Sequence, residues 1–360
     1  MMAAQVTSIL VVNAGSTSLK LSLVDEDERA TRLDSIDDVD AAGVAGVAHR
    51  VVHGGLRFRQ PVVIDDEVRD EIFALQSLAP LHNAPALAGI ATAQRALPDA
   101  SHVAVFDTAF HATMPDEAAV YALPRRWREE WGVRRYGFHG LSVAWSAERA
   151  PALVGPADGL RLVVCHLGGG SSITAVRDGR SVDTTMGFSP LEGVPMTTRS
   201  GSVDPGALLY VLGTRKLRRE TLDHALNFES GLKGLAGGSG TMLELERRLA
   251  EGDRAAELAL DVFTHRVAGA VAAMAASAGG LDALVFTAGI GEGSALARAR
   301  VCARLAFLGV ELDTVRNDGA EPDCDVAAAD SATRVLVVRA REEIVAARAA
   351  RALLLSQPSR

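Results

Sequence analysis

The sequence predicts an α/β protein built from two similar halves. A pattern of strand, turn and strand over residues 8–23 occurs again over residues 162–176, about half a chain later. A further apolar strand, residues 283–287, leads through a glycine-rich turn into an Ala-rich helix. The length of 360 residues also suits two domains of ordinary size. A duplicated two-lobed architecture explains these three observations together.

Both copies of the repeat place small or hydroxyl-bearing residues between two apolar strands. The first copy has strands at 8–12 and 19–23 around the turn 13–18, and the second has strands at 162–164 and 173–176 around the turn 166–172. Backbone N–H groups and hydroxyls in such turns can surround an anion. Two unrelated hairpins with plain glycine turns are the alternative interpretation of the same pattern.

The other segments predict helices and a connecting loop that mainly support the fold. Apolar spacing indicates a helix over residues 68–79 that ends before Pro80, and a long Ala-rich helix over residues 257–278. A third helix is expected over residues 342–355, because its two leading glutamates suit a helix N-terminus. Residues 25–44 are acidic and poor in apolar side chains, which predicts a surface connection.

Composition excludes several classes of partner. The formal net charge of −8 argues against a nucleic-acid binder. No apolar run approaches the roughly 20 residues of a membrane span, and the N-terminus lacks the charged region of a signal peptide, so we expect a cytoplasmic protein without a membrane partner. The three cysteines show no C-x-x-C spacing, which indicates neither disulfides nor a zinc site.

Arginine, histidine and aspartate side chains in polar, glycine-flanked settings are typical of phosphoryl transfer. Arg50 and Arg199 each offer a planar cationic fork to phosphoryl oxygens. Asp107 ends an apolar strand, where a carboxylate can orient a nucleophile or hold a cation, and His139 lies between turn residues. Taken singly, each arginine also fits a surface ion pair, and the histidine fits a scaffold role.

An ordered set of motifs, which covers nearly the whole chain, resembles the acetate kinase family, including propionate and butyrate kinases. The motifs are NAGSTSLK at 13–20, HRVVHGG at 49–55, APLHN at 79–83, FDTAFH at 106–111, RYGFHG at 135–140, PLEG at 190–193 and FTAGIGE at 286–292.

This resemblance implies an acetate and sugar kinase/Hsp70/actin (ribonuclease H-like) fold, with two duplicated α/β lobes and a cleft between them. The N-terminal lobe would comprise residues 1–109 and 344–360, and the C-terminal lobe, expected to mediate dimerisation, residues 110–343. The implied reaction is reversible phosphoryl transfer between ATP and acetate or propionate, with Mg²⁺ or Mn²⁺. The expected partners are the small carboxylate, the phosphoryl donor and a second copy of the chain in a homodimer.

The resemblance also implies roles for particular residues. The catalytic set would be Arg50, Asp107, His139 and Arg199. The acid would be bound by Val52, Leu81, His82, Phe138 and Pro190. Phosphates and nucleotide would lie against Ser16, Ser18, Lys20, His166, Gly168, Gly169, Gly170, Gly289, Ile290, Gly291 and Gly293. The metal would be held near Asn13 and Glu342.

The chain departs from the family pattern on the nucleotide side. Gly169 and Gly293 stand where asparagine is usual, Thr241 where aspartate is usual, Leu243 where arginine is usual, and Arg341 where asparagine is usual. These positions leave two alternatives open. One keeps the acid site and changes the donor to pyrophosphate or another nucleotide, and the other is a non-catalytic homologue that binds a small acid or phosphate.

Overall fold

The computed structural model describes residues 8–14, 19–77, 80–155 and 158–357, without the side chains of residues 77 and 80–82. The chain divides into two compact units. Unit 1 comprises residues 1–112, 138–145 and 341–360, and unit 2 comprises residues 113–137 and 146–340. Residues 138–145 thus belong to unit 1, whereas the lobe boundaries expected from the sequence left them in the second lobe.

Unit 1 is built on a six-stranded sheet of order β3-β2-β1-β4-β6-β5. Its strands are β1 (Ser8–Ala14), β2 (Leu19–Val24), β3 (Ala30–Leu33), β4 (Val44–Val51), β5 (Val62–Val63) and β6 (His102–Phe106). Its helices are α1 (Asp66–Ala74), α2 (Pro80–Ala96) and α14 (Glu342–Leu355), and α5 (Gly140–Val154) contributes its first residues. Strands β1, β4 and β6 run parallel, and β2, β3 and β5 pair antiparallel with their neighbours.

Unit 2 contains a second six-stranded sheet, of order β11-β12-β10-β7-β8-β9. Its strands are β7 (Arg161–Leu167), β8 (Ser171–Arg177), β9 (Arg180–Thr184), β10 (Ala283–Thr287), β11 (Cys324–Asp325) and β12 (Arg334–Val337). Its helices are α3 (Asp116–Ala119), α4 (Arg125–Trp131), the remainder of α5, α6 (Pro205–Gly213), α7 (Arg219–Phe228), α8 (Gly231–Ala236), α9 (Met242–Ala250), α10 (Arg254–Ala278), α11 (Ala288–Gly293), α12 (Ala295–Ala303) and α13 (Thr314–Asp318).

The two sheets have the same topology. Read from the opposite edge, the second order is β9-β8-β7-β10-β12-β11, and each strand has the same orientation to its neighbours as its counterpart in unit 1. The two hairpins recognised in the sequence, β1–β2 and β7–β8, occupy equivalent places. The predicted duplicated α/β fold is therefore confirmed.

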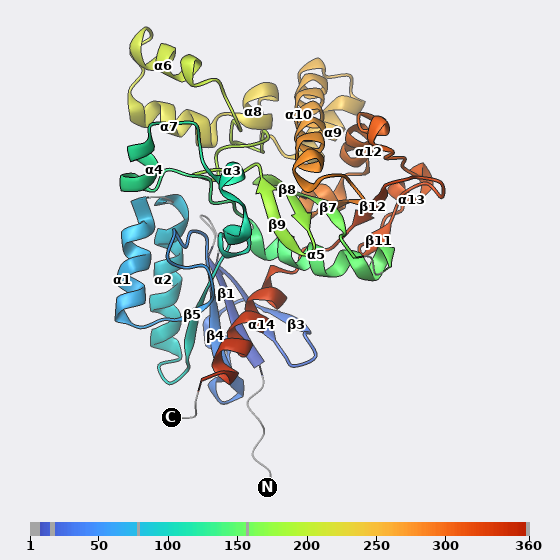
Figure 1. Ribbon diagram of the computed structural model, residues 1–360. Coiled ribbons are helices and arrows are strands. Elements are labelled where there is room, and N and C mark those ends of the chain that lie inside the picture. The colour runs from blue at the N-terminus through green and yellow to red at the C-terminus, as the bar shows by residue number, and fades with distance from the viewer. Residues whose placement is uncertain (1–7, 15–18, 78–79, 156–157, 358–360) are drawn as a thin grey trace. The chain divides into compact units, whose positions relative to one another are not determined.

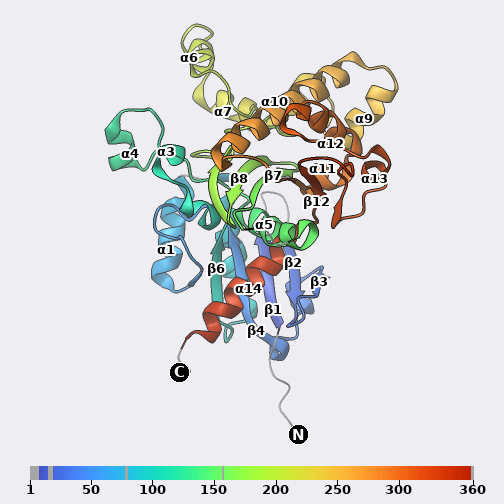
Figure 2. The same ribbon diagram turned by 45° about the vertical axis from the view of Figure 1, so that its right-hand side comes forward.

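Alternating side chains explain how helices cover both faces of the unit 1 sheet. Ile9 and Val11 of β1 pack with Ala346 and Ala347 of α14, while the intervening Leu10 packs with Ala93 of α2. Since successive strand residues point to opposite faces, the two helices lie on opposite sides of the sheet. Figures 1 and 2 show α14 crossing β1 and β4. This packing holds the N-terminus of α14 beside the ends of β1 and β4.

Helix α10 is the main cover of the unit 2 sheet. Its buried Phe263, Val267 and Val271 join the core formed by β7, β8 and β10 (Figure 2). The helix is long and apolar enough to cross a membrane by length and composition, although the sequence analysis recognised no run of that kind. Half of its most apolar window is buried in the protein, as in a core helix.

Several predicted elements are confirmed and others differ. The helix expected over residues 68–79 is α1, which ends at Ala74 and is followed by a 3₁₀ turn at Leu75–Ser77. Helix α14 has the predicted bounds, and α10 begins only three residues before the predicted start. The expected surface connection over residues 25–44 contains a strand, β3, which pairs with β2 at the sheet edge. An edge strand needs few apolar side chains, which is why composition concealed it.

A buried histidine pair links β4 and β6 in unit 1. The Nε2 of His102 donates to the carbonyl of Leu97, so Nδ1 of His102 must accept, and Nε2–H of His49 donates to it at 2.9 Å. The Nδ1 of His49 is buried and has no hydrogen-bond partner among the described residues. Burial, and secondarily the neighbouring His102, lowers the pKa of His49 to about 3. Both rings are therefore neutral at pH 7.

We expect this pair to make stability fall on acidification. Because the pKa of His49 is lower in the folded than in the unfolded chain, its contribution is complete above about pH 6.5 and declines by about 1.4 kcal/mol per pH unit below it. The loss for His49 alone is about 2 kcal/mol at pH 5. Urea unfolding of the wild type and His49→Gln between pH 5 and 8 measures it, and the variant should show a flatter decline. An identical decline in both proteins would contradict this origin.

Candidate functional site

A bidentate ion pair lies at the ends of two neighbouring parallel strands in unit 1. Arg50 is the penultimate residue of β4, and Asp107 directly follows β6. The Nε of Arg50 donates to Oδ1 of Asp107 at 3.0 Å, and Nη2 donates to Oδ2 at 2.6 Å. Asp107 is only 1% exposed. The fold thus fixes a planar guanidinium and a buried carboxylate in one orientation.

Two further polar groups complete this cluster. Asn13 lies opposite Arg50 in the β1–β4 register, and its Oδ1 accepts from Nη1 of Arg50 at 3.1 Å. Glu342, the first residue of α14, lies 3.2 Å from the same nitrogen. Burial by itself would lower the pKa of Arg50, but the charges of Asp107 and Glu342 outweigh it and hold the pKa above its usual range. Arg50 therefore stays cationic.

Asn13 and Glu342 carry oxygens of the kind that a hard divalent cation prefers, but both oxygens contact Nη1 of Arg50 in this structure, so a bound cation would have to displace that contact. Asn13 Nδ2 lies 3.4 Å from Oε2 of Glu342, so an amide and a carboxylate converge from two elements. Mg²⁺ prefers oxygen ligands, retains waters and takes further oxygens from substrate phosphates, so few protein ligands suffice. Among the described residues there is no group of three or more His, Cys, Asp or Glu that could hold a metal ion.

The residues expected to bind the acid are only partly described. Val52 and Phe138 are buried in unit 1, and the ring of Phe138 meets that of His53 edge to face. Leu81 and His82 begin α2, but their side chains lie outside the described residues. Pro190 belongs to unit 2. Asn83 had no predicted role; its side-chain oxygen accepts from the N–H of His53, and its side-chain nitrogen donates to the carbonyl of His53.

His139 has a backbone conformation that is uncommon for a non-glycine residue. Its φ is +59°, in the left-handed region. The next residue must be glycine, because a Cβ at Gly140 would lie 2.0 Å from the carbonyl oxygen of Asp107. His111, another residue without a predicted role, lies 2.9 Å through Nε2 from the carbonyl of Phe138. These contacts fix the start of α5 beside Asp107, and such strain is common at functional sites.

The remaining predicted phosphate residues of the first hairpin are mostly outside the described part. Ser16 and Ser18 lie in residues 15–18, which the structure does not describe. Lys20 is described and lies exposed on β2, opposite Asn13 in the β1–β2 register.

The glycine turn of the second hairpin is close to the loop that carries Arg199. The turn is closed by a bond from Gly168 N–H to the carbonyl of Gly170, and Thr197 N–H lies 3.4 Å from the carbonyl of Gly169. His166 precedes the turn on β7, opposite Ser172. A Cβ at Gly169 would meet nothing within 4 Å, so the outer side of the turn is open.

The Arg199 loop is held in place by the start of α8. The N–H groups of Ser230 and Leu232 donate to the carbonyls of Thr198 and Met196. Nη1 of Arg199 lies 3.4 Å from the carbonyl of Pro190, so these two predicted residues are neighbours. Burial lowers the pKa of Arg199 from its very high ordinary value.

The segment from β10 into α11 lies beside the same glycine turn. A Cβ at Gly168 would lie 3.7 Å from Cβ of Ala288 and 3.9 Å from the backbone nitrogen of Gly289. Positions 289 and 293 have open space where a Cβ would point, so a ligand can approach the backbone closely. Ile290 and Gly291 are buried. Unit 2 therefore brings together the two predicted glycine segments and the Arg199 loop.

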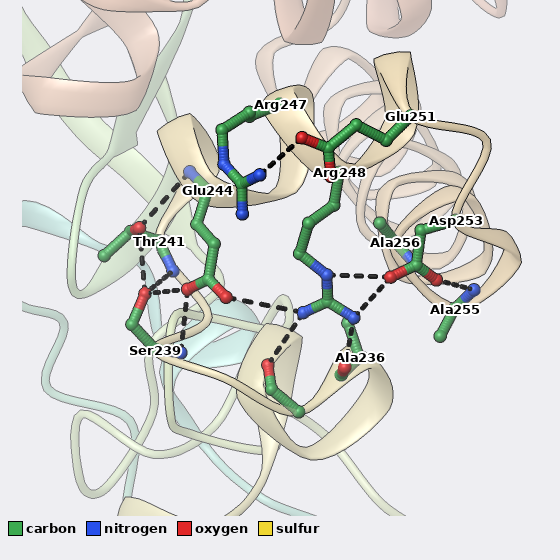
Figure 3. Close-up of polar contacts among 11 residues, drawn as sticks. Ala236, Ser239, Thr241, Glu244, Arg247, Arg248, Glu251, Asp253, Ala255 and Ala256 are labelled. Atoms are coloured by element: carbon green, nitrogen blue, oxygen red, sulfur yellow. Dashed lines mark hydrogen bonds and ion pairs between the residues drawn. The ribbon is translucent and has the colours of Figure 1, made fainter.

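The loop at residues 237–241 is closed by its own side chains (Figure 3). Thr241 caps α9 by accepting from the N–H of Glu244, and the Glu244 carboxylate accepts from the N–H and hydroxyl of Ser239. Arg248 pairs with Asp253 and donates to the carbonyl of Ala236. At position 243, where the resemblance expects arginine, the Leu243 side chain is 81% exposed.

A polar cluster around Glu192 also had no predicted role. Glu192 accepts from Tyr121 Oη and from Nη2 of Arg135, whose Nη1 donates to the carbonyls of Thr184 and Thr185. The sequence feature that could have identified Glu192 is its position in a loop that contains Pro and Gly. A pocket of about 600 Å³ adjoins this cluster, and none of its described lining residues belongs to the predicted site.

The chain is similar to known proteins over most of its length. A family model described as "Acetokinase family" matches residues 30–348. An acetate kinase from Nostoc punctiforme is 48% identical over 86% of this chain and 76% of that protein, and one from Synechococcus sp. is 50% identical over 87% and 78%. A solved propionate kinase from Francisella tularensis has a TM-score of 0.89, 34% identity and coverage of 95% of this chain and 98% of that chain. A solved acetate kinase from Porphyromonas gingivalis has a TM-score of 0.86, 32% identity and coverage of 97% and 100%.

Proposed function

The chain belongs to the acetokinase family, and from that premise we propose that it is a short-chain carboxylate kinase. It transfers a phosphoryl group reversibly between ATP and acetate or propionate, giving the acyl phosphate and ADP. The observation that carries the proposal is the Arg50–Asp107 pair with Asn13 and Glu342 around it. The similarity to proteins named acetate kinase favours this function over a changed donor or a non-catalytic homologue.

In the proposed reaction a carboxylate oxygen of the acid attacks the terminal phosphorus of ATP in line. An O–P bond to the acid forms as the bond between that phosphorus and the bridging oxygen breaks, and ADP leaves with the electron pair. Arg50 and Arg199 bind the acid carboxylate and the migrating phosphoryl group, and His139 donates to the phosphoryl oxygens. Asp107 orients Arg50 and the acid. No covalent protein intermediate is required.

Mg²⁺, held by Asn13 and Glu342, would supply charge neutralisation for the phosphates of the donor. We expect EDTA to abolish acyl phosphate formation and added MgCl₂ to restore it. Glu342→Gln should raise the Mg²⁺ concentration for half-maximal activity by about tenfold or more, or at least about 1.4 kcal/mol, because one of two ligating groups loses its charge. Glu343→Gln, at the neighbouring position, is the control. An unchanged Mg²⁺ requirement in Glu342→Gln would remove Glu342 from the metal site.

We also propose a homodimer and a cytoplasmic location. Helix α6 has no buried residue, and its Leu209 and Tyr210 are largely exposed, which supports an association surface there.

Hydroxamate trapping of acyl phosphate tests the proposed function. Acetate and propionate are each incubated with ATP, with other nucleoside triphosphates and with pyrophosphate. The expected result is acyl phosphate from both acids with ATP, because a pocket distinguishes one methylene by only about 1–3 kcal/mol. Product formed only with pyrophosphate would overturn the donor, and no product with any donor would overturn the kinase.

A further inference from the structure

Arg298 on α12 is a fully buried cation. It is 2% exposed and heads the fully buried side chains in size among the described residues. All four of its hydrogen bonds go to neutral oxygens. Nε donates to Oδ1 of Asn317 at 2.7 Å and Nη2 to the carbonyl of Asn317 at 2.8 Å. Nη1 donates to the carbonyls of Gly291 at 2.9 Å and Glu292 at 2.8 Å.

A buried guanidinium that contacts no carboxylate destabilises the folded protein, so its hydrogen bonds must be considered for a functional role. Burying a charge removes its hydration, and desolvation lowers the pKa of Arg298 accordingly. An apolar side chain of similar length would fill the same space in the core around α12 without that cost. The role of Arg298 therefore depends on the groups to which it donates its hydrogen bonds.

Those groups are the carbonyls near the end of α11. The last carbonyls of a helix have no partner within the helix, and arginine can satisfy them. Helix α11 is short, and its Gly289 and Gly293 are among the residues that the family resemblance assigns to the phosphates and nucleotide. By binding two successive carbonyls, one guanidinium nitrogen fixes the orientation of the α11 peptide planes.

Other contacts support α11 from its remaining sides. The Glu292 carboxylate accepts from the N–H groups of Ala288 and Ala340, both at 2.9 Å. Asn317, itself 1% exposed, donates to the carbonyl of Ala295 and so ties α13 to the start of α12. Arg298 therefore connects Asn317 on α13 to the carbonyls of α11.

We propose that Arg298 is a positioning residue for the phosphoryl donor. It does not touch the donor; it holds the α11 backbone in the conformation that binds it. This inference rests on the proposed function and on the expectation that residues 289–293 bind the phosphoryl donor. Loss of Arg298 should weaken donor binding and leave acid binding almost unchanged.

The test compares Arg298→Met and Arg298→Lys with Arg300→Met. Arg300 lies on the same helix but forms a partly exposed ion pair with Asp261. Loss of a residue that orients a metal ligand typically costs about 10–100-fold in metal affinity, and we expect an effect of similar size where Arg298 orients the α11 backbone. We expect a rise of that size in the KM for ATP and in the Kd for ATP without acid, in Arg298→Met. The KM for acetate should stay within about twofold, and Arg300→Met should match the wild type.

Several results would overturn the inference. These are an unchanged Kd for ATP in a folded Arg298 variant, an equal rise in the KM for acetate, or the same shifts in Arg300→Met. If circular dichroism shows Arg298→Met to be unfolded, Arg298→Lys decides, since it keeps the charge but cannot make all four bonds. If the wild type binds ATP but forms no acyl phosphate, the proposed function is wrong. The comparison of the Kd for ATP between the wild type and the Arg298 variants then still tests the role of Arg298. A wild type that binds no ATP overturns the inference as well.

Discussion

Arg199→Ala should lower kcat/KM for acyl phosphate formation by about 10³–10⁵-fold, the usual effect of losing an arginine that stabilises a phosphoryl group in transfer. The loop that carries Arg199 is fixed by bonds to the start of α8 and by the neighbouring Gly169 carbonyl. The backbone of the loop is therefore held in place, and Nη1 of Arg199 contacts the carbonyl of Pro190, so little rearrangement of the loop is needed when charge develops on the phosphoryl oxygens. The loss should fall mainly on kcat, because the interaction strengthens in the transition state.

The same hydroxamate assay measures this effect. Arg199→Lys should recover only part of the activity, since an ammonium group keeps the charge but cannot bind two oxygens in one plane. Arg219→Ala is the matched control, because Arg219 is an exposed arginine of the same unit and forms an exposed ion pair with Glu220. Activity in Arg199→Ala close to that of Arg219→Ala would exclude Arg199 from the transition state.

Much of the fold follows from local sequence signals, because both sheets are built from β-branched runs punctuated by small residues. Strand β10 has its predicted bounds for this reason, and helix α14 has its predicted bounds because two glutamates mark its first turn. Strand β3 was missed because an edge strand with exposed side chains carries no apolar periodicity. The hairpin repeat was visible because its turns are unusually rich in glycine and hydroxyl residues.

The candidate site was predictable only where chemistry and unusual local sequence coincide. Arg50, Asp107 and His139 stand in turn-like or strand-end settings that a core residue rarely occupies. Arg298 gave no such signal, since it lies in an ordinary Ala- and Arg-rich helix and its partner Asn317 is 19 residues away. Its role depends on which carbonyls the folded chain leaves without partners, which composition and spacing do not reveal.

Removing Asp107 should affect both activity and stability. Asp107→Ala leaves the guanidinium of Arg50 without its bidentate partner; breaking a buried pair typically costs about 3–5 kcal/mol, and the lower end applies here because Glu342 still balances the charge of Arg50. We expect the free energy of unfolding in urea to fall by an amount in that range. Acyl phosphate formation should fall by about 10²–10⁴-fold, because neither Arg50 nor the acid is then oriented.

A double variant separates the two effects. In Arg50→Met/Asp107→Leu no unpaired charge remains between these strands, so most of the lost stability should return. Glu342 also loses Arg50 as a partner, but its place at the N-terminus of α14 still favours a negative charge. Activity should remain as low as in Asp107→Ala, because the double variant restores packing without restoring the groups that bind substrate. Recovery of both properties together would mean that Asp107 acts only through stability, and an activity loss without any stability loss would mean that the pair is not a structural unit.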